Sequence, residues 1–97
     1  MTNWETPFTR EWIQHLREQT EDGDLKSLMI DESDKKTHSQ AVRITDFRAL
    51  LDQVEAGDPN AARPEPSVAE GRSGWVLVSN RLLDGLLATA KAGGPVR

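Results

Sequence analysis

The sequence of 97 residues contains no cysteine and no tyrosine, and few of its residues are aromatic. Without cysteine, the chain cannot form a disulfide, a thiolate metal site or a cysteine nucleophile. No apolar run approaches the roughly 20 residues of a membrane span. The first residues carry neither the basic stretch nor the apolar core of a secretory signal. These absences predict one cytoplasmic domain over residues 1–97, with a modest hydrophobic core and no contact with a membrane.

Positive charge is also scarce, because 16 acidic residues stand against 12 basic ones for a net charge of −4. The excess of acid lies in the N-terminal part, mostly between Glu18 and Asp34. This distribution disfavours non-specific binding of nucleic acid, which depends on neutralising phosphates with Lys and Arg. It suits either docking on a basic protein surface or ordinary solvation of a small acidic protein.

The sequence contains no motif for metal binding, phosphate binding or nucleophilic catalysis. The two histidines, His15 and His38, have no paired spacing that would hold a metal ion. The glycines near Ser73 are too few for a phosphate-binding loop, and no serine stands in a nucleophile elbow. We therefore expect no enzyme activity, no metal and no cofactor.

One pattern occurs twice: a short β-branched run is followed by a capping residue, a leucine-rich helical stripe and glycine. The copies are residues 42–59, VRITDFRALLDQVEAGDP, and residues 76–95, VLVSNRLLDGLLATAKAGGP. With one gap of two residues, Val42 aligns with Val76, Thr45 with Ser79 and Gly57 with Gly93. The match is explained either by duplication or by the similarity that any strand–cap–helix–glycine unit of a leucine-rich protein shows.

The periodicity predicts six elements. A first helix begins near Thr6 and Pro7, or at Thr9 as the alternative N-cap, and ends in the acidic run with Gly23. Its stripe, like that of the helix starting at Thr45 or Asp46, recurs every three to four residues. The third helix starts at Ser79 or Asn80 and contains Gly85, which weakens it by about 1 kcal/mol relative to Ala. The expected strands are 27–31, 40–44 and 75–78.

The class predicted from these elements is α+β: a small three-stranded sheet covered by helices, in the order α-β-β-α-β-α. The first two strands are expected to form a wide hairpin around the loop 32–39. The strand 75–78 is wholly apolar, which favours a central position with both faces covered. Residues 58–74 are Pro-rich with few large apolar side chains and predict a long flexible loop.

The three tryptophans separate into two groups. Trp12 falls on the apolar stripe of the first helix and Trp75 opens a buried strand, so both are expected in the core. Trp4 precedes the first helix without an evident packing partner. It either folds back on the core or is exposed as a binding anchor, a role in which Trp is enriched.

About thirty residues carry a resemblance to a known family. The stretch 42–58, VRITDFRALLDQVEAGD, resembles the opening strand and helix of Phd/YefM-type antitoxins, and residues 75–87, WVLVSNRLLDGLL, are similar to a later strand and helix. The resemblance implies a dimeric DNA-binding transcriptional regulator, with Arg43 and Arg48 contacting phosphates. Some forty residues precede the family's first strand here, and the Pro-rich loop replaces its middle strand and basic turn.

The function expected from the residues themselves is that of a small, acidic, non-catalytic binding protein of bacterial or phage type. It would regulate or inhibit a macromolecular partner, most simply a protein with a basic surface, by occupying that surface. The candidate contacts are Trp4 and three acidic residues, Asp31 at the end of the expected strand and Glu32 and Asp34 in the loop that follows. A strand with an open edge would also allow a homodimer.

Overall fold

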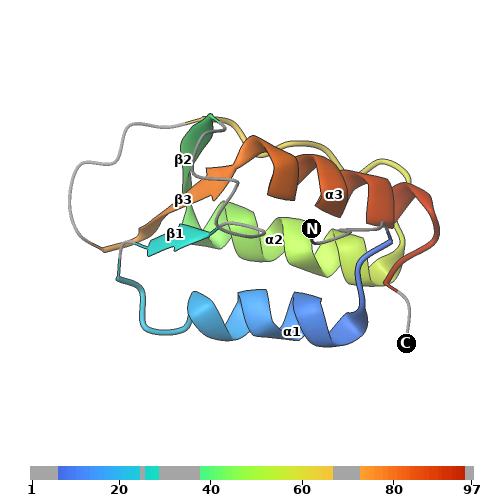
Figure 1. Cartoon of the computed structure of the whole chain (residues 1–97), viewed down its shortest axis with the longest axis horizontal. Coiled ribbons are helices and arrows are strands. Elements are labelled where there is room, and N and C mark those ends of the chain that lie inside the picture. The colour runs from blue at the N-terminus through green and yellow to red at the C-terminus, as the bar shows by residue number, and fades with distance from the viewer. Residues whose placement is uncertain (1–6, 25, 29–37, 67–72, 96–97) are drawn as a thin grey trace, which may run out of the picture.

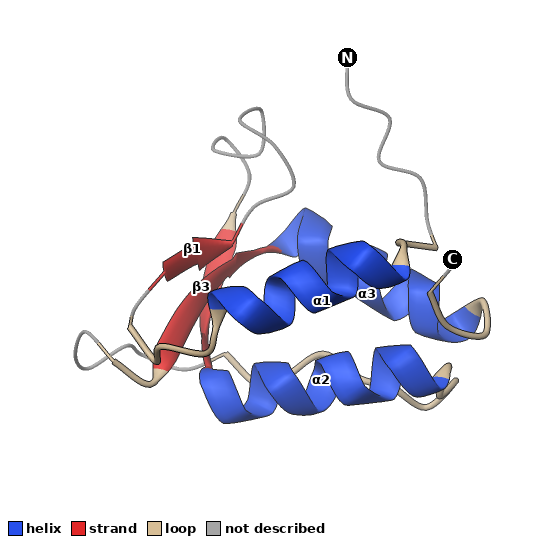
Figure 2. Cartoon of the chain, turned by 90° about the horizontal axis from the view of Figure 1, so that it is seen from below, coloured by secondary structure: helices blue, strands red, loops and turns tan. Residues whose placement is uncertain are grey.

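A computed structural model describes residues 7–24, 26–28, 38–66 and 73–95 of the chain (Figure 1). The elements, in order, are α1 (Arg10–Gln19), β1 (Lys26–Leu28), β2 (Ser39–Arg43), α2 (Ile44–Ala56), β3 (Trp75–Ser79) and α3 (Asn80–Lys91). The predicted class and the predicted order of elements are confirmed. The strands lie together at one end of Figure 1, and the helices extend away from them (Figure 2).

The sheet has the strand order β1-β3-β2, so the predicted hairpin is wrong. β3 lies between the other two strands, parallel to β1 and antiparallel to β2. The prediction paired neighbours in the sequence, whereas the most apolar strand takes the centre, where it is hydrogen-bonded on both sides. The predicted central position of β3 is therefore confirmed. Residues 29–37, which include most of the expected hairpin loop, lie outside the described residues.

Helix boundaries follow the capping chemistry at two of the three N-termini. The side chains of Thr9 and Ser79 each accept a hydrogen bond from a backbone N–H of the first turn, at 3.1 Å. The expected start of the first helix near Thr6 and Pro7 is wrong, because α1 begins at Arg10 and uses the alternative cap, Thr9. The predicted start at Thr45 or Asp46 is one or two residues late, because α2 already begins at Ile44; its N-cap, Arg43, makes no side-chain capping bond. Ile44 is buried, and its backbone N–H donates to the Gly74 carbonyl at 3.0 Å, so this group at the start of the helix has an acceptor without a polar cap.

The core lies between the helices and one face of the sheet. It contains the stripes that the sequence predicts on all three helices, together with alternate residues of the strands. Val42 and Val76 are opposite each other in the sheet and fully buried. Phe47, Leu50 and Val54 of α2 belong to the same core cluster as the leucines of α3, and the two helices are in contact.

The two copies of the repeated pattern occupy matching positions in the fold and contact each other. Val42 pairs with Val76, its aligned residue, in antiparallel register. The helices α2 and α3 end side by side, since a Cβ on Gly57 would lie 2.3 Å from the carbonyl oxygen of Gly93. This is the arrangement that a local two-fold axis produces. In the structure the two-residue gap lies between strand and helix, because α2 begins two residues after Val42 and α3 four residues after Val76. The expected alignment of Thr45 with Ser79 is therefore wrong, since Thr45 lies inside α2 whereas Ser79 is the N-cap of α3.

The segment Asp58–Pro66, here called the strap, follows α2 and returns towards the sheet. Ala61 packs against the core, and the Arg63 guanidinium forms an ion pair with Asp84 of α3. The Gln40 side chain of β2 donates to the carbonyl oxygen of Pro64 at 3.3 Å. Residues 67–72 lie outside the described residues, so the flexibility expected over 58–74 stays a prediction.

Candidate functional site

The face of the sheet that points away from the helices is the first candidate. Side chains alternate along a strand, so the buried Val42, Val76 and Val78 leave their neighbours on the opposite side. These neighbours define what we call the open face: Ser27, Ala41, Arg43, Trp75 and Leu77. Ser27 and Arg43 are exposed, while the other three are half-buried. The open face therefore combines apolar surface with one cationic side chain.

Arg43 and Trp75 contact each other on the open face. They are cross-strand partners, and the guanidinium carbon of Arg43 lies 5.3 Å from the centroid of the Trp75 ring. A cation–π contact of this kind contributes about 0.5–1 kcal/mol at an exposed site. The contact orders an arginine beside a tryptophan, and both residue types are enriched at protein-binding hot spots.

The expectation that Trp75 belongs to the core is wrong. Trp75 is half-buried on the open face and is not among the buried residues of the core. The apolar run 75–78 suggested cover on both faces, but only Val76 and Val78 are buried. The alternation itself, with Arg43 exposed next to buried Val42, was the signal for an open face. Trp12 does pack against the core, although it is only half-buried.

The four residues predicted to contact a partner all lie outside the described residues. Trp4 lies before the first described residue, and Asp31, Glu32 and Asp34 fall in the range 29–37. Their roles in partner binding stay predictions.

The resemblance to antitoxins gives roles to Arg43 and Arg48, which the structure places in different surroundings. Arg43 is exposed at the end of β2. Arg48 is half-buried, and its Nη1 lies 3.4 Å from the hydroxyl of Thr20 at the end of α1. Their phosphate contacts stay predictions, but only Arg43 is displayed at the surface.

A neighbouring arginine, Arg17, joins α1 to α2. Its guanidinium lies 2.7 Å from a carboxylate oxygen of Asp52 and 3.0 Å from one of Glu55. Partial burial lowers the pKa of Arg17, but the hydrogen bonds to both carboxylates outweigh that effect and raise the pKa above its usual value. This cluster is occupied in holding the helices together, so its charges are satisfied within the chain.

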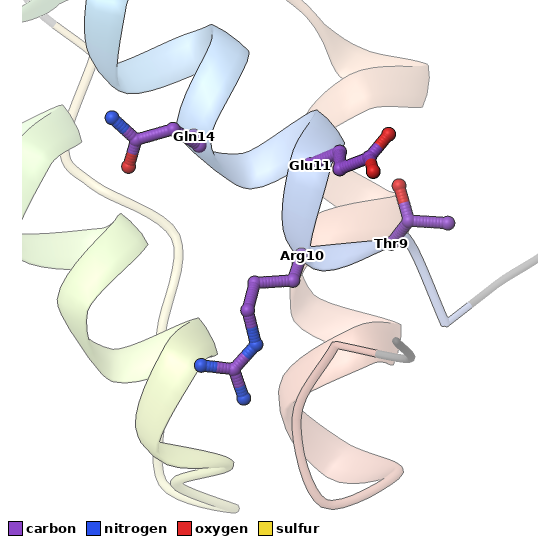
Figure 3. A pocket seen from close by; sticks show the side chains of 4 residues that line it. All are labelled: Thr9, Arg10, Glu11 and Gln14. Atoms are coloured by element: carbon purple, nitrogen blue, oxygen red, sulfur yellow. The ribbon is translucent and has the colours of Figure 1, made fainter.

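A hollow of about 650 Å³ opens beside the first turn of α1 and is lined by Thr9, Arg10, Glu11 and Gln14 (Figure 3). Arg10 extends towards α2, and Glu11 points away from it. The Thr9 hydroxyl already accepts the Trp12 backbone N–H as the N-cap. The described lining thus offers charge and hydrogen bonding to a ligand, with its one hydroxyl committed to the helix.

A second, smaller groove of about 360 Å³ lies between α2 and the strap. Leu50 forms part of its lining, with Asp46 and Gln53 from α2 and Pro64 and Glu65 from the strap. Its polar groups come from two acids and an amide.

The histidines take no shared position among the described residues. His15 is exposed on α1 and stacks on Trp12, with ring centroids 5.3 Å apart and planes inclined by 20°. The backbone carbonyl of His38 accepts a hydrogen bond from Asn80. Within the described part of the chain, no three His, Asp or Glu side chains gather as a metal site would require.

Comparison with known proteins adds no assignment: no family model, no curated protein and no solved structure matches this chain. In the described ranges, no helix has the length and apolar composition needed to cross a membrane.

Proposed function

We propose that this chain is a small, non-catalytic binding protein that regulates or inhibits a protein partner by occupying its surface. The observation that carries the proposal is the open face, where Arg43 stacks on Trp75 beside half-buried Leu77. Tryptophan and arginine anchor protein interfaces because each combines a large contact area with polar or cationic character. The acid-rich loop, with Asp31, Glu32 and Asp34, supplies charge that favours a basic partner.

The open face and the acidic loop have complementary roles in this proposal. The open face provides apolar contact and therefore affinity, which depends on well-packed anchors. The loop speeds encounter with a basic surface, an effect that weakens as salt screens the charges. Substitutions in the open face are therefore expected to change mainly the dissociation rate of the complex, and substitutions in the loop mainly its association rate, because rim charges mainly change the rate of association.

The test is affinity capture from the native host, followed by binding measurements with the partner that is captured. Arg43→Ser and Leu77→Ser, which remove side chains from the open face, should each weaken binding at least tenfold by faster dissociation. Glu32→Lys with Asp34→Lys should slow association and reduce its salt dependence. The matched control is Glu11→Lys with Glu65→Lys, since both residues are exposed away from the open face.

Two results would remove the proposal. One is full binding of a purified partner by the open-face variants and the loop variant alike. The other is turnover of a substrate by the isolated chain. Salt-sensitive binding of duplex DNA that is lost in Arg43→Ala and Arg48→Ala would instead support the regulator implied by the antitoxin resemblance.

A further inference from the structure

β2 is an edge strand, and its outward backbone groups can be identified. Ile44 N–H donates to the Gly74 carbonyl at 3.0 Å, and Asn80 N–H donates to the His38 carbonyl at 2.9 Å. Hydrogen-bonded pairs alternate along an antiparallel ladder, so residues 38, 40, 42 and 44 direct their backbone groups at β3. Ser39, Ala41 and Arg43 therefore direct their N–H and C=O groups away from the sheet.

This edge has little of the usual protection against pairing, because its one charged residue, Arg43, stands at the end of the strand. Natural edge strands carry lysine, proline or a bulge that prevents the approach of another strand. The sequence of β2, SQAVR, contains neither lysine nor proline. Its register with β3 runs unbroken over all five residues, so the strand has no bulge there. Within the described ranges, the strap meets β2 through the Gln40 side chain, and no strand lies on the outer edge.

We propose that β2 pairs with β2 of a second copy of this chain, antiparallel and centred on Ala41. In that register Ala41 faces its own counterpart, and Arg43 faces Ser39 of the other copy. The outward N–H and C=O groups of Ser39, Ala41 and Arg43 then all bond across the interface. The strand is self-complementary in this register because the central side chain is small and its one charge meets a neutral hydroxyl.

The pairing joins the two sheets into one of six strands. The two-fold axis stands perpendicular to the sheet, because Ala41 and its counterpart point to the same side. Both open faces therefore lie on that side and form one continuous surface. This inference goes beyond the proposed function and does not rest on it, since the dimer is set by backbone bonds and the function by side chains of the open face.

The dimer is expected to be weak. Pairing of one five-residue strand buries less than the roughly 1,200 Å² at the lower limit of standard interfaces, so a dissociation constant in the micromolar range or weaker follows. Sedimentation equilibrium of the full chain from micromolar to millimolar concentration measures it directly. A chain that stays monomeric throughout that range overturns the proposal.

The first variant pair tests the edge. Ala41→Pro removes one outward N–H, which β3 does not use, and should abolish dimerisation while β2 and β3 stay paired. Ala41→Ser keeps the N–H and should dimerise like the natural chain. Equal dimerisation by both variants overturns the proposal. Because proline at position 41 also tests whether β2 can hold this residue without unfolding, the thermal unfolding of Ala41→Pro is compared with that of Ala41→Ser.

The second variant pair tests the register and decides the matter if Ala41→Pro unfolds. Ser39→Glu places a carboxylate opposite Arg43 at two symmetric positions, whereas Ser39→Lys places a second cation there. Opposite charges stabilise a cross-strand pair and like charges destabilise it, so each variant should change the dissociation constant by about two- to thirty-fold, in opposite directions. A dissociation constant that neither variant changes, or that both variants change in the same direction, overturns the proposed pairing.

Discussion

Gly85→Ala separates what the sequence predicts from what the packing imposes. In an isolated helix the substitution should stabilise by about 1 kcal/mol, because alanine has the higher helix propensity. In the folded chain, however, a Cβ on Gly85 would lie 2.3 Å from Cζ and 2.8 Å from Cε2 of the Phe8 ring. Phe8 is 3% exposed, so its ring has little room to withdraw.

The magnitude follows from these opposing terms. Overpacking a filled core costs about 1–3 kcal/mol, which exceeds the gain of about 1 kcal/mol from helix propensity. The backbone N–H of Phe8 also donates to the buried Thr89 hydroxyl at 2.8 Å, which fixes the ring over α3. We therefore expect Gly85→Ala to lower the free energy of unfolding by about 1 kcal/mol, or the melting temperature by roughly 4–8 °C for a domain of this size.

A double-mutant cycle with Phe8→Leu isolates the contact. Leucine lacks the distal ring atoms that meet the added methyl, so Gly85→Ala in the Phe8→Leu background should stabilise by up to about 1 kcal/mol. The assay is urea unfolding followed by tryptophan fluorescence and circular dichroism. Stabilisation by Gly85→Ala in the natural background, or the same effect in both backgrounds, would refute the close approach of Phe8 and α3.

Substitutions at Gly57, Thr89 and Arg17 test three other contacts by the same unfolding assay. Gly57→Ala should cost more than 2 kcal/mol, since its φ of 66° disfavours a side chain and its Cβ would strike the α3 C-terminus; Gly23→Ala, with a φ of 77° and open space around it, should cost only about 1–2 kcal/mol. Thr89→Val should cost about 1–3 kcal/mol because it removes the buried hydroxyl that accepts the Phe8 N–H and donates to the Gly85 carbonyl, and Thr89→Ser should restore most of the loss. Arg17→Gln should cost about 1 kcal/mol at low salt and less in 1 M NaCl; a loss that does not change with salt would contradict a role for its ion pairs.

Of the candidate functional site, the sequence predicted little. The residues chosen for exposure or acidity, Trp4 and the loop acids, lie outside the described residues. Arg43 was selected through the antitoxin resemblance, while Trp75 was assigned to the core. Their contact across β2 and β3 depends on a strand pairing between residues distant in the chain, and no local pattern specifies which strands will pair.

The sequence alone determined the elements, because helix and strand formation depend on local signals. The apolar stripes, the cap at Ser79 and the glycine at the end of α2 all act within a few residues, and each is found where its pattern predicts. At α1 the alternative cap, Thr9, is used in place of the expected start near Thr6 and Pro7. The tertiary structure decided the order of the strands, the start of α2 at the buried Ile44, and the face on which Trp75 lies. These features follow from burial of the whole apolar surface at once: placing β3 between β1 and β2 hydrogen-bonds both sides of the most apolar strand, and the helices can cover only one face of the sheet.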